Sequence, residues 1–368
     1  MHRIVAFALL LLPVACGGGN GPRRIAANLL AAPHVGDELL LTLTEPDDPA
    51  EVDEVLNDLQ GLAIERIGQT SVFVLMLPPA TDLQQVLDDL EGDLRVVVST
   101  PNYLAESPEG GPGTVPTFGS DLLANIADQG ALTGAGLPAA HQVTRGAGVV
   151  VAVVDTGVDF SHAFLQGSLH PGGFDFIGQD ADPSEERNFL DDDGDGRVDE
   201  QYGHGTYVAS LVHAVAPDAM ILPVRALDDE GFGTASAVSA AVAYAVDMGV
   251  QVINVSVDIP NSPEAVQEAI DYAQERGVVV VAAAGNEGLS GVVFPARYRE
   301  VIGVTAVGPG DVAPAFANHG SQVDLVAPGV DLIGAVPLSL NPLGTARWSG
   351  TSFAAPLVAG GAALVLAR

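Results

Sequence analysis

The 368-residue sequence contains no Lys, a single Cys and only 5% aromatic residues. With one Cys, at position 16, the chain can form neither an internal disulfide nor a metal site built from several thiolates. Its 14 basic residues, all Arg, face 47 Asp and Glu, which gives a formal net charge of -33. This charge repels nucleic-acid phosphates and anionic lipid headgroups, so nucleic acid is excluded as a partner. Hydrophobic residues make up 48% of the chain, which excludes disorder and allows two or three folded domains.

The first apolar run, residues 4–12, is shorter than the ~20 residues that span a bilayer. With a basic residue before it and small residues after it, residues 1–15 are typical of an export signal. Cys16 and the glycines after it resemble the lipidation site of bacterial lipoproteins, although Pro13 stands where that motif usually has Leu. Lipidation at Cys16, ordinary signal cleavage and a retained N-terminal segment all remain open. The first two predict an exported protein, either in the cell envelope or secreted, that meets a membrane only through a lipid anchor; residues 16–34 are then a tether.

Residues 35–106 alternate between strand-like and helix-like patterns. The expected strands lie at 38–44, 71–77 and 94–99, and the expected helices at 49–60 and 81–90. This order predicts a small α+β domain with a ferredoxin-like arrangement. Residues 107–117 are rich in Pro and Gly, which predicts an exposed, flexible linker that is easily cleaved.

Residues 118–368 show the pattern of an α/β domain, in which apolar strands alternate with helices. The expected strands lie at 149–154, 220–224, 250–255, 278–283 and 301–307. Strands that are apolar throughout are typical of a parallel sheet, because helices cover both of its faces. We therefore expect a parallel β-sheet flanked by helices.

Four polar residues stand beside these apolar runs or between glycines. Asp155 ends an apolar strand, where open α/β sheets place functional groups. His204 lies between two glycines, which allow the backbone to approach closely. Asn286 follows another strand, and its amide can donate to a developing oxyanion. Ser352 opens a helix whose first N–H groups can stabilise negative charge. Taken one at a time, each of the four also fits an ordinary turn or cap residue.

Together these residues follow the chain order Asp, His, Ser, and the sequence around them matches a known family. The matching segments are RGAGVVVAVVDTGVD, GHGT, PVRALDDEGFGT, GVVVVAAAGNEG, VDLVAPGV and SGTSFAAP. They resemble the subtilisin-like serine proteases, or subtilases, over roughly residues 115–368. The resemblance implies a subtilisin-like fold and a serine endopeptidase that acts on peptides or proteins. An esterase of the α/β-hydrolase type is not favoured, because no G-x-S-x-G surrounds Ser352.

By this resemblance Ser352 is the nucleophile, and His204 takes its proton and returns it to the leaving amine. Asp155 orients His204, and the oxyanion is held by Asn286 and by the backbone N–H of Ser352. The resemblance implies no cofactor for catalysis. Two nearby residues do not align with the catalytic pair and are expected to be structural: Asp159 and His162.

Relatives bind an extended peptide between two cleft edges. By resemblance, one edge here consists of Gly231, Phe232 and Gly233, and the other of Ser256, Val257 and Asp258. Asp258 stands where the family commonly has a small residue that lines the primary specificity pocket. Either this rim is reshaped, or the carboxylate favours a basic side chain. The acidic segment 228–230 points to the second alternative.

Residues 191–200 read DDDGDGRVDE, in which carboxylates alternate before a glycine. This pattern matches the first half of a calcium loop. The expected ligands are Asp191, Asp193, Asp195, Asp199 and Glu200. It is not an EF-hand, because Tyr202 stands where the bidentate Glu would be. A structural calcium ion close to His204 and a solvated acidic loop are the two alternatives.

Residues 35–106 have the size and position of a subtilase propeptide, and their ending VVVSTPNYLAES resembles the strand with which such propeptides enter their own active site. This implies a self-processed zymogen whose propeptide inhibits the enzyme until a cut falls between about residues 105 and 117. The chain ends 16 residues after Ser352, where relatives usually continue, so helix 357–367 is expected to be partly exposed. The alternative is a degenerate, envelope-anchored binding protein of the same fold with little or no proteolytic activity.

Overall fold

The computed structural model describes residues 29–110, 114–118, 125–192, 194–259 and 261–368. The predicted export signal, Cys16, most of the tether and Asp193 lie outside these residues. Within the described ranges, no helix is long and apolar enough to cross a membrane.

An N-terminal domain follows a short 3-10 helix, η1 (Leu29–Ala31). Its elements are β1 (His34–Leu43), α1 (Pro49–Asp58), β2 (Ala63–Arg66), β3 (Val72–Met76), α2 (Leu83–Leu90) and β4 (Val96–Glu106). The strand order is β2-β3-β1-β4, and all neighbouring strands are antiparallel. This is the ferredoxin-like arrangement. Strand β2 was not predicted from the sequence.

Both helices of this domain begin at an aspartate cap and cover one face of its sheet. Asp48 and Asp82 accept hydrogen bonds from the first free N–H groups of α1 and α2, which fixes where each helix starts. Alternate residues of the strands point at the helices, so Leu39, Leu41 and Leu75 are fully buried beneath them. The domain therefore has an apolar core of its own.

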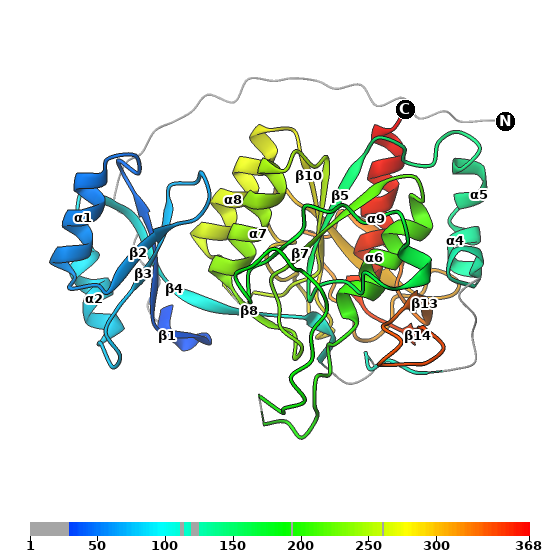
Figure 1. Ribbon diagram of the computed structural model, residues 1–368, viewed down its shortest axis with the longest axis horizontal. Coiled ribbons are helices and arrows are strands. Elements are labelled where there is room, and N and C mark those ends of the chain that lie inside the picture. Colours follow the sequence, from blue (N-terminus) through cyan, green and yellow to red (C-terminus); the bar gives the residue numbers. More distant parts are fainter. Residues whose placement is uncertain (1–28, 111–113, 119–124, 193, 260) are drawn as a thin grey trace.

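Strand β4 continues beyond this domain and joins it to the rest of the chain. Figure 1 shows β4 reaching from the N-terminal domain to β8 (Phe232–Thr234), with which it pairs antiparallel. After β4 the chain forms η2 (Pro108–Gly110), and residues 107–109 are buried. The expectation of an exposed linker from residue 107 was therefore wrong for its first residues, because they lie in the cleft of the following domain.

The C-terminal domain is built on a parallel sheet in the order β12-β11-β10-β9-β5-β7-β6. Its strands are β5 (Val150–Asp155), β6 (Phe174–Asp175), β7 (Met220–Arg225), β9 (Val252–Val255), β10 (Val279–Ala283), β11 (Ile302–Val307) and β12 (Leu325–Pro328). Strands β5, β7, β9, β10 and β11 correspond to the five predicted from the sequence, which confirms the parallel sheet.

Helices cover both faces of this sheet, as Figure 1 shows. Helices α6 (His204–Val215) and α9 (Thr351–Leu366) pack on one face, and α7 (Ala235–Asp247) and α8 (Glu264–Glu275) on the other. Within β5, Val151 and Val153 belong to the first apolar layer, and Ala152 and Val154 to the second. A strand buried on both faces needs an apolar residue at every position, which explains its sequence.

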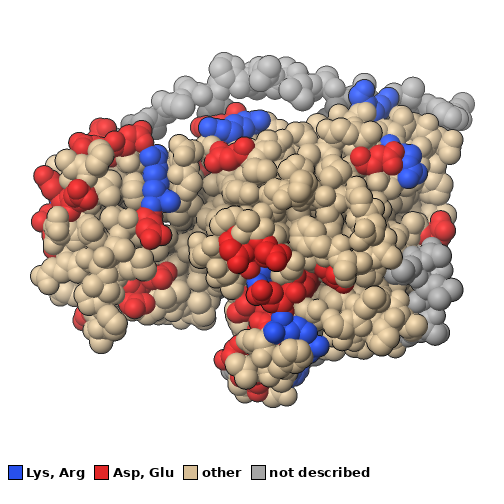
Figure 2. Space-filling model, in the orientation of Figure 1, with Lys and Arg blue, Asp and Glu red and all other residues tan. Residues whose placement is uncertain are grey.

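Smaller elements surround these layers. They are α3 (Asn125–Asp128), α4 (Gly130–Gly134), α5 (Leu137–Ala140), η3 (Ala163–Leu165), β13 (Leu332–Ala335) and β14 (Thr345–Trp348). At the end of α9, Val365 is 69% and Leu366 47% exposed, and Val358 and Ala362 are partly exposed earlier in the helix, which agrees with its expected partial exposure. Acidic side chains dominate the charged surface in Figure 2, especially over the outer part of the N-terminal domain.

Candidate active site

Three polar residues predicted from separate segments meet at one end of the parallel sheet. Asp155 is the last residue of β5, His204 the first of α6 and Ser352 the second of α9. All three are 0% exposed. Asp155 Oδ1 lies 2.6 Å from His204 Nδ1 and also accepts the N–H of Thr156 at 2.8 Å. Asp155 thus binds the imidazole at Nδ1 and leaves Nε2 available to a second group.

Glycines around His204 permit the close packing of the two turns. Gly203 has a φ of 96°, a left-handed conformation that favours glycine. A Cβ at Gly205 would clash with the carbonyl oxygen of Gly157, in the turn that follows Asp155. The GHGT segment is therefore required for the approach of His204 to Asp155.

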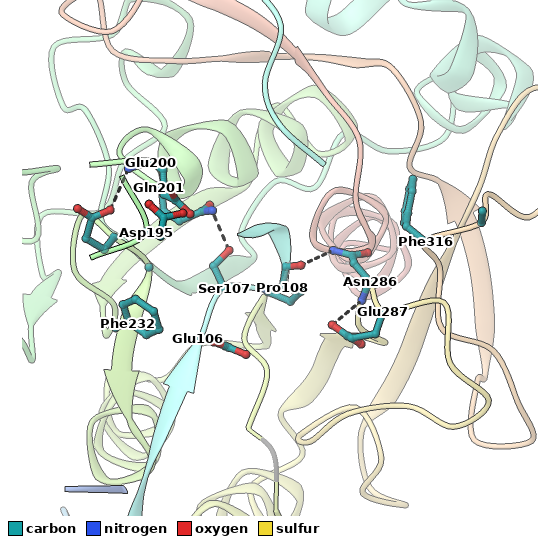
Figure 3. Close-up of a pocket in the computed structure, with 13 residues that line it drawn as sticks. Glu106, Ser107, Pro108, Asp195, Glu200, Gln201, Phe232, Asn286, Glu287 and Phe316 are labelled. Atoms are coloured by element: carbon teal, nitrogen blue, oxygen red, sulfur yellow. Dashed lines mark hydrogen bonds between the residues drawn. The ribbon is translucent and has the colours of Figure 1, made fainter. Parts of the chain in front are cut away.

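Asn286 lies at the other side of the centre, with its amide oriented by the start of α9. Its Oδ1 accepts the N–H of Thr351 at 2.9 Å, so its Nδ2 points toward the cleft. There Nδ2 donates to the carbonyl oxygen of Pro108 at 3.1 Å, as Figure 3 shows. This is the geometry expected of an oxyanion-hole donor acting on a substrate carbonyl.

His204 does not bond the Ser352 hydroxyl in this structure. Its Nε2 lies 3.1 Å from Oε2 of Glu109, and Ser352 Oγ has no hydrogen-bond partner among the described residues. Burial alone would lower the pKa of His204, but the carboxylates of Asp155 and Glu109 raise it to about 10. The sequence did not identify Glu109; the only signal was its position directly after the strand expected to enter the cleft.

Glu185 is a second carboxylate at this site that was not predicted, and it is partly buried. Its Oε2 accepts the Gly203 N–H at 2.6 Å, and its Oε1 accepts the N–H and hydroxyl of Thr206 at 2.9 and 3.0 Å. It also lies within 3.4 Å of the hydroxyl of Thr156, the residue after Asp155. Burial raises the pKa of Glu185 to about 8, although these donors act in the opposite direction. Glu185 therefore links the turn of Asp155 to the start of the His204 helix.

Residues 104–107 lie between both predicted cleft edges as an added strand. On one edge, Ala105 faces Gly233, Glu106 faces Phe232, and the Ser107 N–H donates to the Gly231 carbonyl at 2.8 Å. On the other edge, Glu106 and Asp258 exchange N–H···O bonds of 2.9 and 2.7 Å. In Figure 3, Ser107 and Pro108 follow this strand into the space next to Asn286. The remaining two residues of the second edge are buried behind it: Ser256 and Val257.

Asp258 lies among other carboxylates. Burial, together with the nearby charges of Glu287 and Glu106, raises the pKa of Asp258 to about 8. The acidic segment 228–230, by contrast, is turned toward a neighbouring loop. Asp229 accepts the Asn188 N–H at 2.7 Å, and Glu230 accepts the N–H groups at positions 199 and 200. This segment therefore supports the loop before His204 and is weak evidence for a basic substrate.

The four expected calcium ligands that the structure describes do not converge. Asp191 accepts the N–H groups of residues 194 and 196, and Asp195 and Glu200 pair with Arg197 at 3.5 and 3.4 Å. Asp199 pairs with Arg187 at 2.8 Å. Of the residues that the structure describes, no three His, Cys, Asp or Glu side chains form a group that fits a metal ion. As they stand, these carboxylates are neutralised by arginine and backbone donors and do not fit a calcium site.

The two neighbours expected to be structural have structural contacts. Nε2 of His162 lies 2.9 Å from the Gly344 carbonyl, and Asp159 accepts the Ser161 N–H at 2.8 Å.

Comparison with known proteins agrees with this geometry. The subtilase family (peptidase S8) matches residues 146–368, which include all four predicted catalytic residues. A thermophilic serine proteinase of Bacillus sp. (strain AK1) is 40% identical over 240 residues, 62% of this chain and 55% of that protein. Thermitase of Thermoactinomyces vulgaris is 37% identical over 241 residues, 63% of this chain and 79% of its own. The chain thus spans little more than half the length of the first of these relatives.

Among solved structures, fervidolysin from Fervidobacterium pennivorans, described as a keratinolytic enzyme related to subtilisin, is similar with a TM-score of 0.70 at 26% identity. The similarity covers 90% of this chain and 55% of that one. This share is larger than the C-terminal domain alone can supply. The similarity therefore extends beyond the C-terminal domain.

Proposed function

The chain belongs to the subtilase family, and from that premise we propose that it is a serine endopeptidase made as a self-processed zymogen. One observation carries the proposal: a strand of the N-terminal domain lies in the cleft between both edges and brings the Pro108 carbonyl to Asn286 Nδ2. A peptide substrate would be bound in the same way.

In the proposed reaction, Ser352 Oγ attacks the substrate carbonyl carbon while its proton passes to His204 Nε2. Asp155, bonded to His204 Nδ1 at 2.6 Å, holds the ring and stabilises its cationic form. The oxyanion is held by Asn286 Nδ2 and the Ser352 N–H. His204 then protonates the leaving amine, and water releases the acyl group by the reverse path.

In the same proposal, the N-terminal domain is the enzyme's own inhibitor. The pairing of Ala105 with Gly233 and of Glu106 with Asp258 supports this, because both cleft edges are expected to bind a substrate. Export, a lipid at Cys16, a structural calcium ion and a preference for basic side chains at Asp258 remain predictions from the sequence.

The test is the mass of the purified full-length chain over time, for wild type, Ser352→Ala and Ser349→Ala. We expect wild type and Ser349→Ala to split between residues 105 and 117, because Ser349 lies outside the centre and its hydroxyl accepts the Asp331 N–H. Ser352→Ala should fold with an unchanged melting temperature and stay intact. Equal splitting of Ser352→Ala would refute self-processing. If all three stay intact and fail to cleave any peptide, the binding-protein alternative is favoured.

A further inference from the structure

The carboxylate of Glu109 lies inside the catalytic centre, although this residue precedes the catalytic domain. Its Oε1 accepts hydrogen bonds from Asn286 Nδ2 at 2.8 Å and from the Ser352 N–H at 3.2 Å. Its Oε2 lies 3.1 Å from His204 Nε2. Only 2% of Glu109 is exposed to solvent. One carboxylate therefore occupies both donors of the oxyanion hole and the free nitrogen of the base.

Each of these contacts prevents a step of the proposed reaction. While Nε2 of His204 bonds the carboxylate, it cannot accept the proton of Ser352. While Asn286 and the Ser352 N–H bond the carboxylate, they are not free to stabilise an oxyanion at a carbonyl. The Pro108 carbonyl receives only a share of Asn286 Nδ2, at 3.1 Å. The peptide bond between Pro108 and Glu109 thus lies at the centre without the donors that its hydrolysis needs.

The chain holds Glu109 in this position from several sides. The Ser107 hydroxyl donates to Glu109 Oε2 at 3.1 Å, and the Thr114 hydroxyl donates to the Glu109 carbonyl at 2.8 Å. A Cβ at Gly350 would clash with the Glu109 side chain, so glycine is required for the carboxylate to enter. Both the backbone and the side chain of Glu109 are therefore bound.

We propose that the catalytic centre contains a carboxylate-binding site and that Glu109 is its tethered ligand, which keeps the uncut chain latent and protects the Pro108–Glu109 bond. The site recognises a carboxylate through two N–H donors and the imidazolium of His204. The inference rests on the proposed function, because latency has meaning only for an active centre.

The charges around His204 support this assignment. Two carboxylates face its ring, Asp155 at Nδ1 and Glu109 at Nε2, and both ring nitrogens are within hydrogen-bond distance of them. Such an arrangement favours the doubly protonated ring. A cationic His204 is the counter-charge for Glu109 and cannot act as a base. Glu109 therefore blocks the centre chemically as well as sterically.

A consequence follows for self-processing. Wild type must release the Glu109 carboxylate before it can cut, so its processing is slow. Without this carboxylate, Asn286 Nδ2 and the Ser352 N–H can both donate to the Pro108 carbonyl oxygen, and Ser352 Oγ can attack the carbonyl carbon. The C–N bond to residue 109 then breaks, the new amine takes the proton from His204, and water hydrolyses the acyl group. The new N-terminus is residue 109.

The first experiment compares full-length wild type with Glu109→Gln, and with Glu91→Gln as a control for a lost charge on the same domain, where Glu91 is exposed. A fluorophosphonate probe is applied in short pulses, and intact mass separates labelled from unlabelled chains that are still uncut. We expect uncut Glu109→Gln to be labelled at least about 10-fold faster than wild type, and Glu91→Gln to behave as wild type. Edman sequencing should place the variant's new N-terminus at residue 109. Equal labelling of uncut wild type and Glu109→Gln would overturn the proposal.

A second experiment tests the ligand class. In full-length Glu109→Ala the position of the carboxylate is open, and sodium acetate is the probe. Acetate at ~0.2 M should slow fluorophosphonate labelling several-fold, compared with the same concentration of sodium chloride, since a tethered group acts at millimolar or higher effective concentration. Slowing by both salts alike, or by neither, would refute a carboxylate site.

A third measurement does not depend on activity. In full-length Ser352→Ala at pH 8, the 15N signals of His204 should show both ring nitrogens protonated, and in Ser352→Ala/Glu109→Gln they should not. Identical signals in the two chains would overturn the proposal that Glu109 is a tethered ligand of the centre, whether or not the chain is a protease. Failure of every form to react with probe or peptide would instead overturn the proposed function alone.

Discussion

Two glutamates contact the start of α6, the helix that carries His204. Glu185 accepts the N–H groups of Gly203 and Thr206. In the cleft, Glu109 accepts the N–H of Ser352 and the amide of Asn286, and it lies beside His204. The two carboxylates are chemically alike, although Glu109 is the more deeply buried, and we expect them to have opposite effects on activity.

The difference lies in what their donors are needed for. The N–H groups at the start of α6 have no other partner within the helix, so Glu185 satisfies them in every state of the protein. The donors that Glu109 uses are required by the reaction, so the same kind of bond withholds them from a substrate. A buried carboxylate supports an active site or blocks it according to whether its donors have another task.

The largest effect is expected for Asn286→Ala, which removes a donor that the proposed reaction needs and that Glu109 uses. We expect the turnover of a peptide substrate to fall about 10²–10³-fold, the range found when one oxyanion-hole donor is removed from a related serine protease. Because Asn286 also holds Glu109, the amides of Ser107 and Glu109 in the uncut variant should exchange with solvent faster than in wild type. The matched change Asn341→Ala also removes a buried side-chain amide of this domain, one that bonds the Thr345 carbonyl, so it separates lost packing from a lost donor.

Loss of turnover with unchanged amide exchange would mean that Asn286 does not hold the cleft segment. Equal turnover of wild type and Asn286→Ala would remove the oxyanion hole from the proposed mechanism.

Glu185→Ala should have the next largest effect, and with the opposite sign to changes at Glu109. It leaves the buried N–H groups of Gly203 and Thr206 without a partner, which costs on the order of 2 kcal/mol of unfolding free energy for each unsatisfied group. We expect a lower melting temperature and slower peptide hydrolysis, whereas Glu109→Gln speeds up labelling. The control is Glu186→Ala, because the side chain of Glu186 is 67% exposed and its partner, the buried Arg225, keeps a second ion pair with Asp175.

The pH dependence of this effect has a defined sign. The folded-state pKa of Glu185, about 8, is above its ordinary value, so the folded protein holds the proton that the unfolded chain releases. Its contribution to stability is therefore complete below the ordinary pKa of Glu and is lost as the pH rises toward 8. Glu185→Gln, which is neutral at every pH, should flatten this part of the stability profile in urea unfolding from pH 5 to 9. An unchanged profile would show that Glu185 is ionised throughout.

The sequence was informative where an apolar run ended at a polar residue beside glycine. Asp155 and Asn286 follow apolar strands of the parallel sheet, which are apolar because helices cover both faces. His204 and Ser352 instead lie at the starts of helices, close to Gly203 and Gly350. Strand β2, in contrast, consists of four residues, two of them charged, and none is fully buried. β2 is a strand because it pairs with β3, and its own four residues give no sign of this pairing.

Glu109 and Glu185 could not be predicted for a related reason. Both stand in polar stretches, one rich in Pro and Gly and the other acidic, whose composition is typical of exposed loops. Their burial results from docking onto the start of α6 and into the cleft, and neither surface is local in sequence. In the same way, the pattern of carboxylates at residues 191–200 did not reveal the arginines that pair with Asp199 and Asp195.

A smaller effect is expected for pH, through Asp258. The main chain of Asp258 bonds that of Glu106 in the cleft segment. Burial, together with the charges of Glu287 and Glu106, raises the pKa of Asp258 to about 8 while the segment lies in the cleft. We expect an open cleft to expose Asp258 and remove the charge of Glu106, so the closed cleft holds a proton that an open one releases. Its hold on the segment should weaken as the pH rises from the ordinary pKa of Asp toward 8. In uncut Ser352→Ala, exchange of the Glu106 and Asp258 amides, corrected for intrinsic rate, should be several-fold faster at pH 8.5 than at pH 6. Asp258→Asn should remove most of this difference, while Glu91→Gln should keep it. The same pH dependence in Asp258→Asn would assign the effect to another group.

Calcium should have the smallest effect. Asp199 and Asp195 already pair with Arg187 and Arg197, so an ion at residues 191–200 would have to displace these arginines or do without both carboxylates. When uncut Ser352→Ala is moved from a calcium buffer to one with a chelator, its melting temperature should change by no more than about 3 °C. Exposed charge pairs and loops contribute roughly 1 kcal/mol or less to the free energy of unfolding. A larger shift that Asp191→Asn abolishes would show that the loop binds the ion after rearranging. In that case residues 191–200, like Glu185, would stabilise the position of His204. Two features of the chain would then support His204, whereas Glu109 blocks it.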